Sequence, residues 1–189
     1  VTPFYWASNK TQEKLDNAGI AYDKVVNQFR FWEQFVLATP FDHIKVMHQL
    51  RMEQRWKRPY EVEKKDHWDL THRFRYKLTV YVPLFKNEFG PRSWFLSLYD
   101  EIFMQAGPSI TYNHFEDNRL FMGLGRNLGR LWQVQAGYML SFRHAGPPHV
   151  NDQGTIIMPY EDRHIVRLSF YHHLDFHLDH KVKERDIPI

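Results

Sequence analysis

The sequence predicts an all-β protein, an antiparallel up-and-down transmembrane β-barrel whose N-terminal strands are missing from this chain. Residues 68–83 give the clearest evidence. Their even-numbered members are apolar or aromatic except for His72, and their odd-numbered members are mostly polar. Successive side chains of a strand point to opposite faces, so this alternation predicts a strand with one apolar face and one polar face.

The same alternation recurs along the chain. Further strands are expected at residues 25–38, 43–56, 93–105, 117–127, 132–144 and 163–177. Residues 1–6 read as a short extended stub, the end of a strand whose beginning is missing, and residues 11–17 as a helical turn within a long loop. Short turns alternate with long loops, which is typical of outer-membrane barrels.

Composition limits the alternatives. The chain has 189 residues, a formal net charge of +3 and no cysteine. We expect one domain over residues 1–189, with a charged tail at 178–189. The basic residues alternate along strands and form no stripe, so no nucleic-acid partner is predicted. No uninterrupted apolar run reaches the roughly 20 residues of a spanning helix, which leaves alternating strands as the only way through a membrane.

Tryptophan positions indicate which face meets which medium. In a soluble lipocalin-like barrel the apolar face points inward, and in a membrane barrel it points outward. Trp56 and Trp68 flank one long loop, and Trp94 and Trp132 begin strands after turns. All four lie on apolar faces near strand ends, as aromatic girdles do at the two surfaces of a bilayer. The membrane interpretation is therefore favoured.

The polar faces carry long charged side chains that are expected to meet inside the barrel. The predicted lumen network comprises Arg51, Glu53, Arg73, Arg75, Glu101, Arg119 and Arg167. One interpretation is a salt-bridge network that fills a narrow interior, for which the planar guanidinium is well suited. The other is a basic lumen that selects anions or anchors a plug.

Glu33 and Asp100 fall on apolar faces, where a carboxylate is expensive in hydrocarbon. Either a bulge or a register shift turns each one inward, or this part of the wall faces another protein instead of lipid. Both alternatives remain open at the level of sequence.

No catalytic, cofactor or metal site is predicted. Ser97, Ser141 and Ser169 lack any nucleophile motif. A histidine-rich segment contains His172, His173, Asp175, His177 and His180. Strand positions four apart are separated by roughly 13 Å, too far to share one ion without ligands from elsewhere.

Several segments resemble one known family. They are VNQFRFWEQF, HQLRMEQRW, THRFRYKLTVYVPL, SLYDEIFMQ, FEDNRLFMGLGRNL and VQAGYMLSF. They look like the successive motifs of an uncharacterised bacterial outer-membrane family, domain of unknown function 2490, and the likeness runs from about Val26 to His177. The resemblance implies an outer-membrane location and further strands before Val1, and it implies no activity.

The function expected from these observations is non-enzymatic: a structural or accessory subunit of a larger assembly in the bacterial outer membrane. Its partners would be outer-membrane lipid and other outer-membrane proteins. A small channel for polar or anionic solutes is the first alternative, and a lipid-modifying enzyme is the second.

Overall fold

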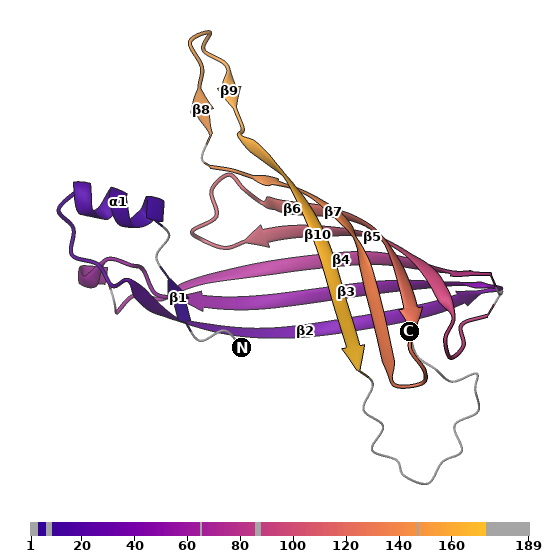
Figure 1. Ribbon diagram of the computed structural model, residues 1–189. Helices are drawn as coiled ribbons and strands as arrows, with labels where there is room; N and C mark the ends of the chain where they lie inside the picture. The colour runs from indigo at the N-terminus through magenta and orange to yellow at the C-terminus, as the bar shows by residue number, and fades with distance from the viewer. Residues whose placement is uncertain (1–3, 7–8, 65, 86–87, 147, 173–189) are drawn as a thin grey trace. The chain divides into compact units, whose positions relative to one another are not determined.

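The structure is a computed structural model that describes residues 4–6, 9–64, 66–85, 88–146 and 148–172 (Figure 1). Its main element is an eight-stranded sheet in the order β1-β2-β3-β4-β5-β6-β7-β10, in which neighbours are hydrogen-bonded. The bounds are β1 (Phe4–Trp6), β2 (Val25–Phe41), β3 (Ile44–Lys57), β4 (Asp69–Leu84), β5 (Trp94–Ala106), β6 (Phe115–Asn127), β7 (Trp132–His144) and β10 (Tyr160–His172). Consecutive strands of this sheet are neighbours, so the predicted all-β antiparallel fold is confirmed.

The strand ends lie close to those expected from alternation. The strand predicted at residues 132–144 coincides with β7 (Trp132–His144). The last strand, β10, begins at Tyr160, three residues before the predicted start, because residues 160–162 pair with residues 142–144 of β7. The rest of the predicted last strand and the tail at 178–189 lie outside the described residues.

Short helices and a small hairpin lie in the connections between strands of the main sheet. Helix α1 (Asn9–Asn17) contains the helical turn predicted at 11–17, and a 3-10 turn, η1 (Val62–Lys64), follows β3. A small hairpin of β8 (His149–Val150) and β9 (Ile156–Ile157) extends from the connection between β7 and β10 (Figure 1). This hairpin was not predicted from the sequence. Neither helix in the described part of the chain combines the length and apolar content needed to cross a membrane.

The chain divides into two compact units. The first comprises Val1–Phe35, Leu50–Arg75 and Phe103–Glu116, and the second comprises Val36–Gln49, Tyr76–Ile102 and Asp117–Ile189. The boundaries cut through β2, β3, β4 and β5, so each unit contains parts of several strands.

Buried and exposed side chains alternate along the strands, but here the polar side chains are buried and the apolar ones exposed, which is the reverse of a water-soluble sheet. On β5 the buried set contains Ser97 at 1% and Glu101 at 5% exposure, whereas Met104 of the apolar set is 52% exposed. On β10 the apolar residues Val166 and Phe170 are 87% and 66% exposed. On these strands the polar face is therefore the covered one, and the apolar face is the exposed one.

Aromatic rings and glycines fit together on the covered face of the second unit. Phe95 is fully buried, and a Cβ added to Gly125 would lie 2.1 Å from its Cζ atom. The ring of Phe121 occupies the corresponding space above Gly123 and Gly137, where an added Cβ would lie 2.5 Å from Phe121 Cζ in each case. Glycine within a strand often marks such a close approach. Here the missing side chains make room for phenyl rings.

We predict that Gly125→Ala lowers the free energy of unfolding by about 1–3 kcal/mol, because the added methyl group must displace the buried Phe95 ring. The matched control is Gly90→Ala, since an added Cβ at Gly90 meets nothing within 4 Å. Urea unfolding in detergent micelles measures both variants. Equal stability of the two variants would contradict the ring-on-glycine packing, and Phe95→Leu should relieve part of the Gly125→Ala defect.

Candidate functional site

The polar face of the first unit is organised around Glu53 of β3. Its side chain is 4% exposed and lies 3.9 Å from Arg30 Nη1, 3.8 Å from Arg51 Nη1 and 3.8 Å from Arg73 Nη1. Arg30 comes from β2 and Arg73 from β4, the two strands beside β3. A buried carboxylate is costly unless it is paired, so these guanidinium groups compensate its charge. We call Glu53, Arg30, Arg51 and Arg73 the Glu53 cluster.

A second carboxylate extends this cluster. Glu116 of β6 lies 2.6 Å from Arg73 Nε and 4.0 Å from Arg55 Nη1. Arg55 also donates a hydrogen bond from Nη2 to Gln105 Oε1 at 3.2 Å. Arg73 thus contacts both Glu53 and Glu116. One guanidinium on β4 therefore joins a carboxylate on β3 to a carboxylate on β6.

An aromatic ring supports the arginines of β4. The guanidinium carbon of Arg73 lies 4.5 Å from the centre of the Phe103 ring, and that of Arg75 lies 5.7 Å from it. Phe103 is only 1% exposed. Guanidinium groups over a buried ring gain cation–π attraction at little cost in hydration. This contact places Arg75, which sequence reasoning had put in the salt-bridge network, against an aromatic partner.

The second unit contains a separate acidic centre at Asp117. This carboxylate pairs with Arg119 through Nε and Nη2, both at 2.7 Å, and accepts a hydrogen bond from Ser141 Oγ at 2.7 Å. Asp117 is 4% exposed. Both Arg119 nitrogens contact Oδ2, and Oδ1 accepts the hydrogen bond from Ser141, so each oxygen of the carboxylate has a partner. Arg119 is therefore fixed by a neighbour on its own strand.

Tyr99 links charge and packing in the same unit. Arg167 Nη1 donates to the Tyr99 hydroxyl oxygen at 2.9 Å, and the hydroxyl donates to Met139 Sδ at 3.2 Å. The Tyr99 ring stacks on Phe121 with centres 4.7 Å apart, and Lys77 Nζ lies 3.9 Å from the Tyr99 ring centre. The covered face of this unit is thus filled by rings as well as by charges.

The structure therefore brings some of the predicted lumen residues together and separates others. Arg51, Glu53 and Arg73 meet in the Glu53 cluster, and Glu101 is 5% exposed in the second unit. Arg119 and Arg167 belong to the centres at Asp117 and Tyr99. The residues of these centres that were not predicted from the sequence are Arg30, Arg55, Glu116, Asp117 and Tyr99. The alternation of side chains along the predicted strands already placed Arg30 and Arg55 on polar faces. Residue 116 fell in the predicted loop before the strand at 117–127.

The four girdle tryptophans lie at strand ends and contact neighbouring side chains. In the first unit Trp56 packs edge-on against Phe31, and Trp68 lies against Phe29. In the second unit Trp132 is 50% exposed, and the guanidinium of Arg126 lies 5.0 Å from the ring centre of Trp94. Each ring therefore stands beside other rings or cations at the end of a strand.

Glu33 and Asp100 both stay on the apolar side. Glu33 is exposed on β2, with the same parity as Phe31 and Phe35. Asp100 accepts a hydrogen bond from Asn118 Nδ2 at 2.6 Å. No inward rotation of either carboxylate is seen, so the bulge or register-shift explanation is wrong for both.

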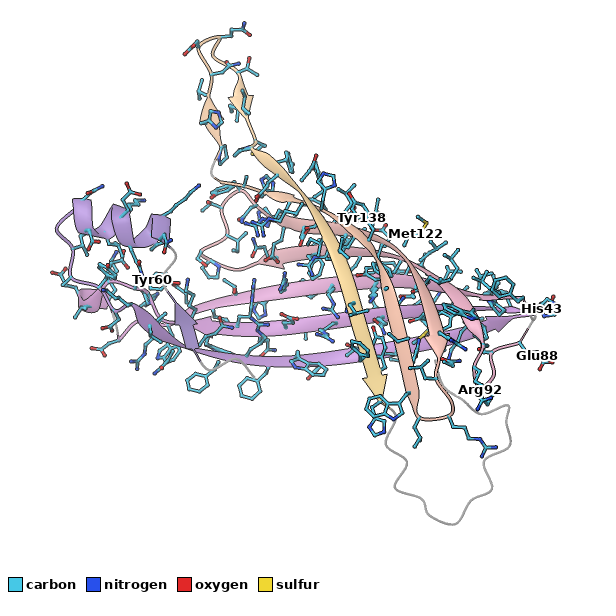
Figure 2. The ribbon with its side chains drawn as sticks, viewed as in Figure 1. His43, Tyr60, Glu88, Arg92, Met122 and Tyr138 are labelled. Carbon is cyan, nitrogen blue, oxygen red and sulfur yellow. The ribbon has the colours of Figure 1, made fainter. Side chains whose placement is uncertain are left out.

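Polar side chains on the apolar face of the second unit occur in pairs that the sequence analysis missed. His48 Nδ1 and the Tyr76 hydroxyl are 2.8 Å apart, and the Tyr138 hydroxyl contacts His164 Nδ1. A shallow, mostly apolar groove of about 420 Å³ runs beside the Asp100–Asn118 pair. Its wall includes Met122 and Tyr138, which face each other across β6 and β7 (Figure 2).

The histidine-rich segment is only partly described. His172 stacks on Trp132 with ring centres 4.2 Å apart. His173, Asp175, His177 and His180 lie outside the described residues. Within the described ranges, no group of three or more His, Cys, Asp or Glu is arranged to hold a metal ion.

We predict that Glu53→Gln lowers the free energy of unfolding by roughly 3 kcal/mol, because it removes the buried carboxylate that the three partly buried guanidinium groups of the Glu53 cluster share. Glu63→Gln, at an exposed position of η1, is the control and should change stability by less than about 0.5 kcal/mol. Chemical denaturation in micelles compares the two. If Glu53→Gln unfolds at the same denaturant concentration as Glu63→Gln, the cluster is not a structural centre.

Comparison with known proteins identifies a family. A family model described as "Protein of unknown function (DUF2490)" matches residues 4–151, well over half of the chain and the region from β1 to β8. Neither a curated protein nor a solved structure matches. The match begins before the region expected from the sequence motifs and ends before β10. The chain belongs to the DUF2490 family.

Proposed function

We propose that this protein forms part of the wall of a β-barrel in the bacterial outer membrane, as a structural or accessory subunit without enzymatic activity. The observation that supports the proposal is the inverted burial: charged side chains are covered and apolar side chains are exposed. Such an arrangement is costly in water, and it suits a sheet whose outside meets hydrocarbon.

The apolar surface is too continuous to be a chance feature of a soluble protein. Leu120, Met122 and Leu124 of β6 are 50%, 60% and 44% exposed. Leu168 and Phe170 on β10 are 62% and 66% exposed. β6, β7 and β10 are consecutive neighbours in the sheet, so these residues belong to one apolar surface. Soluble monomers seldom expose apolar patches beyond a few hundred Å².

Two pairs of polar side chains on the apolar side of the sheet are arranged as a membrane would require. Hydrogen bonding between Asp100 and Asn118, and between His48 and Tyr76, satisfies groups that lipid cannot solvate. Trp132 at the start of β7 supports the girdle interpretation. These features favour a lipid-facing wall over a soluble barrel with an apolar interior.

The covered face supports a structural role more than a channel. Phe95 is fully buried, and Phe121 and Met139 are 5% and 8% exposed. A water-filled conduction path needs solvent-accessible polar groups, whereas this face in the second unit is closed by packed rings. Paired charges such as Asp117 and Arg119 add to the packing and leave little freely hydrated charge.

The serines considered for an enzyme are not placed to reach lipid. Ser97 and Ser141 are 1% and 3% exposed on the covered face, and Ser141 donates its hydrogen bond to Asp117. Ser169 accepts a hydrogen bond from Arg167. This geometry disfavours a lipid-modifying serine enzyme.

The sheet border supports association with further strands. β1 pairs only with Val25–Asn27, so most of β2 beyond that point has no partner strand on that side among the described residues. Unpaired backbone groups cost several kcal/mol each in hydrocarbon. We therefore propose that another strand, from this polypeptide or from another outer-membrane protein, covers this border. The exposed Glu33 on β2 would then lie beside side chains of the added strand, which can supply a partner for its carboxylate.

Tryptophan fluorescence in reconstituted bilayers tests the lipid-facing wall. Lipids brominated along their acyl chains should quench the emission, because Trp132 on the apolar side of β7 is 50% exposed. The Trp132→Phe variant should lose part of that quenching. Quenching by water-soluble acrylamide instead of brominated lipid would contradict the proposal.

Two assays separate the alternatives. Planar-bilayer recording should show no steady conductance, and regular open channels would favour the channel for polar or anionic solutes. Incubation of purified protein with outer-membrane lipids should release no fatty acid.

Sucrose-gradient fractionation of cells should place the protein with the outer membrane, where co-purifying proteins would identify the assembly.

A further inference from the structure

A polar cavity of about 280 Å³ opens on the covered face of the first unit. Its floor includes Gln28 of β2 and Gln105 of β5, which are 1% and 8% exposed. Its wall includes Arg55 and Lys57 of β3 and Thr71 of β4. None of the four residues of the Glu53 cluster lines this cavity; Arg55, which does, pairs with Glu116, the second carboxylate that Arg73 contacts.

The floor contains a hydrogen-bond donor with unused capacity. Gln28 Nε2 is buried and has no hydrogen-bond partner among the described residues. Leaving a buried donor unsatisfied costs about 1–3 kcal/mol. Because Gln28 lines the cavity, a polar ligand or water there is the natural partner for this amide.

Two cationic side chains stand together on one wall. Residues 55 and 57 are two apart on β3 and so project from the same face. Arg55 is held in place by Gln105 at 3.2 Å and by Glu116 at 4.0 Å. Lys57 Nζ lies 4.5 Å from the ring centre of Tyr60, which Figure 2 labels. The positions of both charges are thus fixed before any ligand arrives.

The loop after β5 is built against the cavity and carries Ser109 to its mouth. Gly107 has a φ of +151°, and a Cβ added to it would lie 2.9 Å from Leu70 O, so only glycine permits this close approach to β4. Gln105 Nε2 donates to Asn113 O at 3.0 Å across the base of the loop. Ser109 lines the cavity from this fixed loop and is exposed.

The number and kind of donors distinguish between anions. A guanidinium, an ammonium, the Gln28 amide and the hydroxyls of Thr71 and Ser109 surround one space. A carboxylate offers two oxygens, whereas a phosphate group offers three strong acceptor oxygens and up to two charges. Arginine and lysine are the usual phosphate-binding side chains. The donor set therefore fits phosphate better than carboxylate.

One acidic side chain indicates which groups the ligand carries besides its phosphate. Asp69 lines the cavity, its side chain is 40% exposed, and it lies 3.2 Å from His67 Nε2. A carboxylate at this position repels a bare anion but accepts hydrogen bonds from hydroxyl groups. The combination favours an anion that carries hydroxyls next to its charge.

We propose that this cavity binds the phosphate group of a small phosphorylated polyol, either a soluble ester or the headgroup of a phospholipid. Lys57 and Arg55 neutralise the phosphate, and Gln28, Thr71 and Ser109 donate hydrogen bonds to its oxygens. Asp69 accepts a hydrogen bond from a polyol hydroxyl. This site goes beyond the proposed structural role, because it assigns a ligand to the covered face. Its test needs only the folded chain in detergent and does not depend on the structural role.

Isothermal titration calorimetry on the full chain in micelles tests the site with three probes: inorganic phosphate, glycerol 3-phosphate and short-chain phosphatidylglycerol. Saturable binding of glycerol 3-phosphate, tighter than that of inorganic phosphate, is the expected result for a soluble ester. Tighter binding of phosphatidylglycerol would assign the site to a lipid headgroup. Saturation by none of the three would overturn the proposal.

Matched lysine variants locate the binding. Lys57→Gln should weaken binding of the tightest probe on the order of tenfold or more, through the loss of one charge-assisted hydrogen bond. Lys64→Gln is the control, because Lys64 is in the same unit, is 65% exposed and pairs with Glu61 away from the cavity. Thr71→Val should weaken binding more mildly without filling the cavity. An equal loss in the Lys57 and Lys64 variants, with unchanged melting temperatures, would show that the binding lies elsewhere.

Discussion

The pairing of buried charges on the polar faces is the constraint on which the rest of the structure depends. Glu53 is 4% exposed and stands among three guanidinium groups, and Asp117 is clamped by Arg119 and Ser141. Charges so well removed from water persist only with partners, and these partners come from neighbouring strands and from the same strand. Once the charged side chains occupy the covered face, the alternation of a strand forces the apolar side chains to the outside.

The two units fill their covered faces by different means. In the first unit arginines surround two carboxylates and lean on the Phe103 ring. In the second unit, phenyl rings lie on glycines, as Phe95 does over Gly125. A polar cavity lies beside the charge pairs of the first unit, whereas in the second unit phenyl rings fill the space above the glycines.

Much of the fold was predictable from the sequence because period-two alternation is a local property. The strand at 132–144 and the orientation of Phe74 and Phe170, which are 47% and 66% exposed, followed from it directly. The contacts of individual charges were less predictable, because they depend on register between strands. Glu116 was assigned to a loop, yet it pairs with Arg73. The β8–β9 hairpin was missed because its strands are two residues long and depend on a turn at Asn151, whose side chain accepts hydrogen bonds from Gln153 N and Thr155 N.

Accessibility of adjacent positions on β10 tests the inverted burial most directly. The natural chain has no cysteine, so Leu168→Cys and Ser169→Cys each provide a single site for a nitroxide label in reconstituted bilayers. Leu168 is 62% exposed on the apolar side, and Ser169 is half-buried on the opposite side. The account predicts that oxygen dissolved in the bilayer relaxes the label at 168 much more strongly than the label at 169. Strong relaxation at 168 by a water-soluble nickel chelate, with little effect of oxygen, would contradict it.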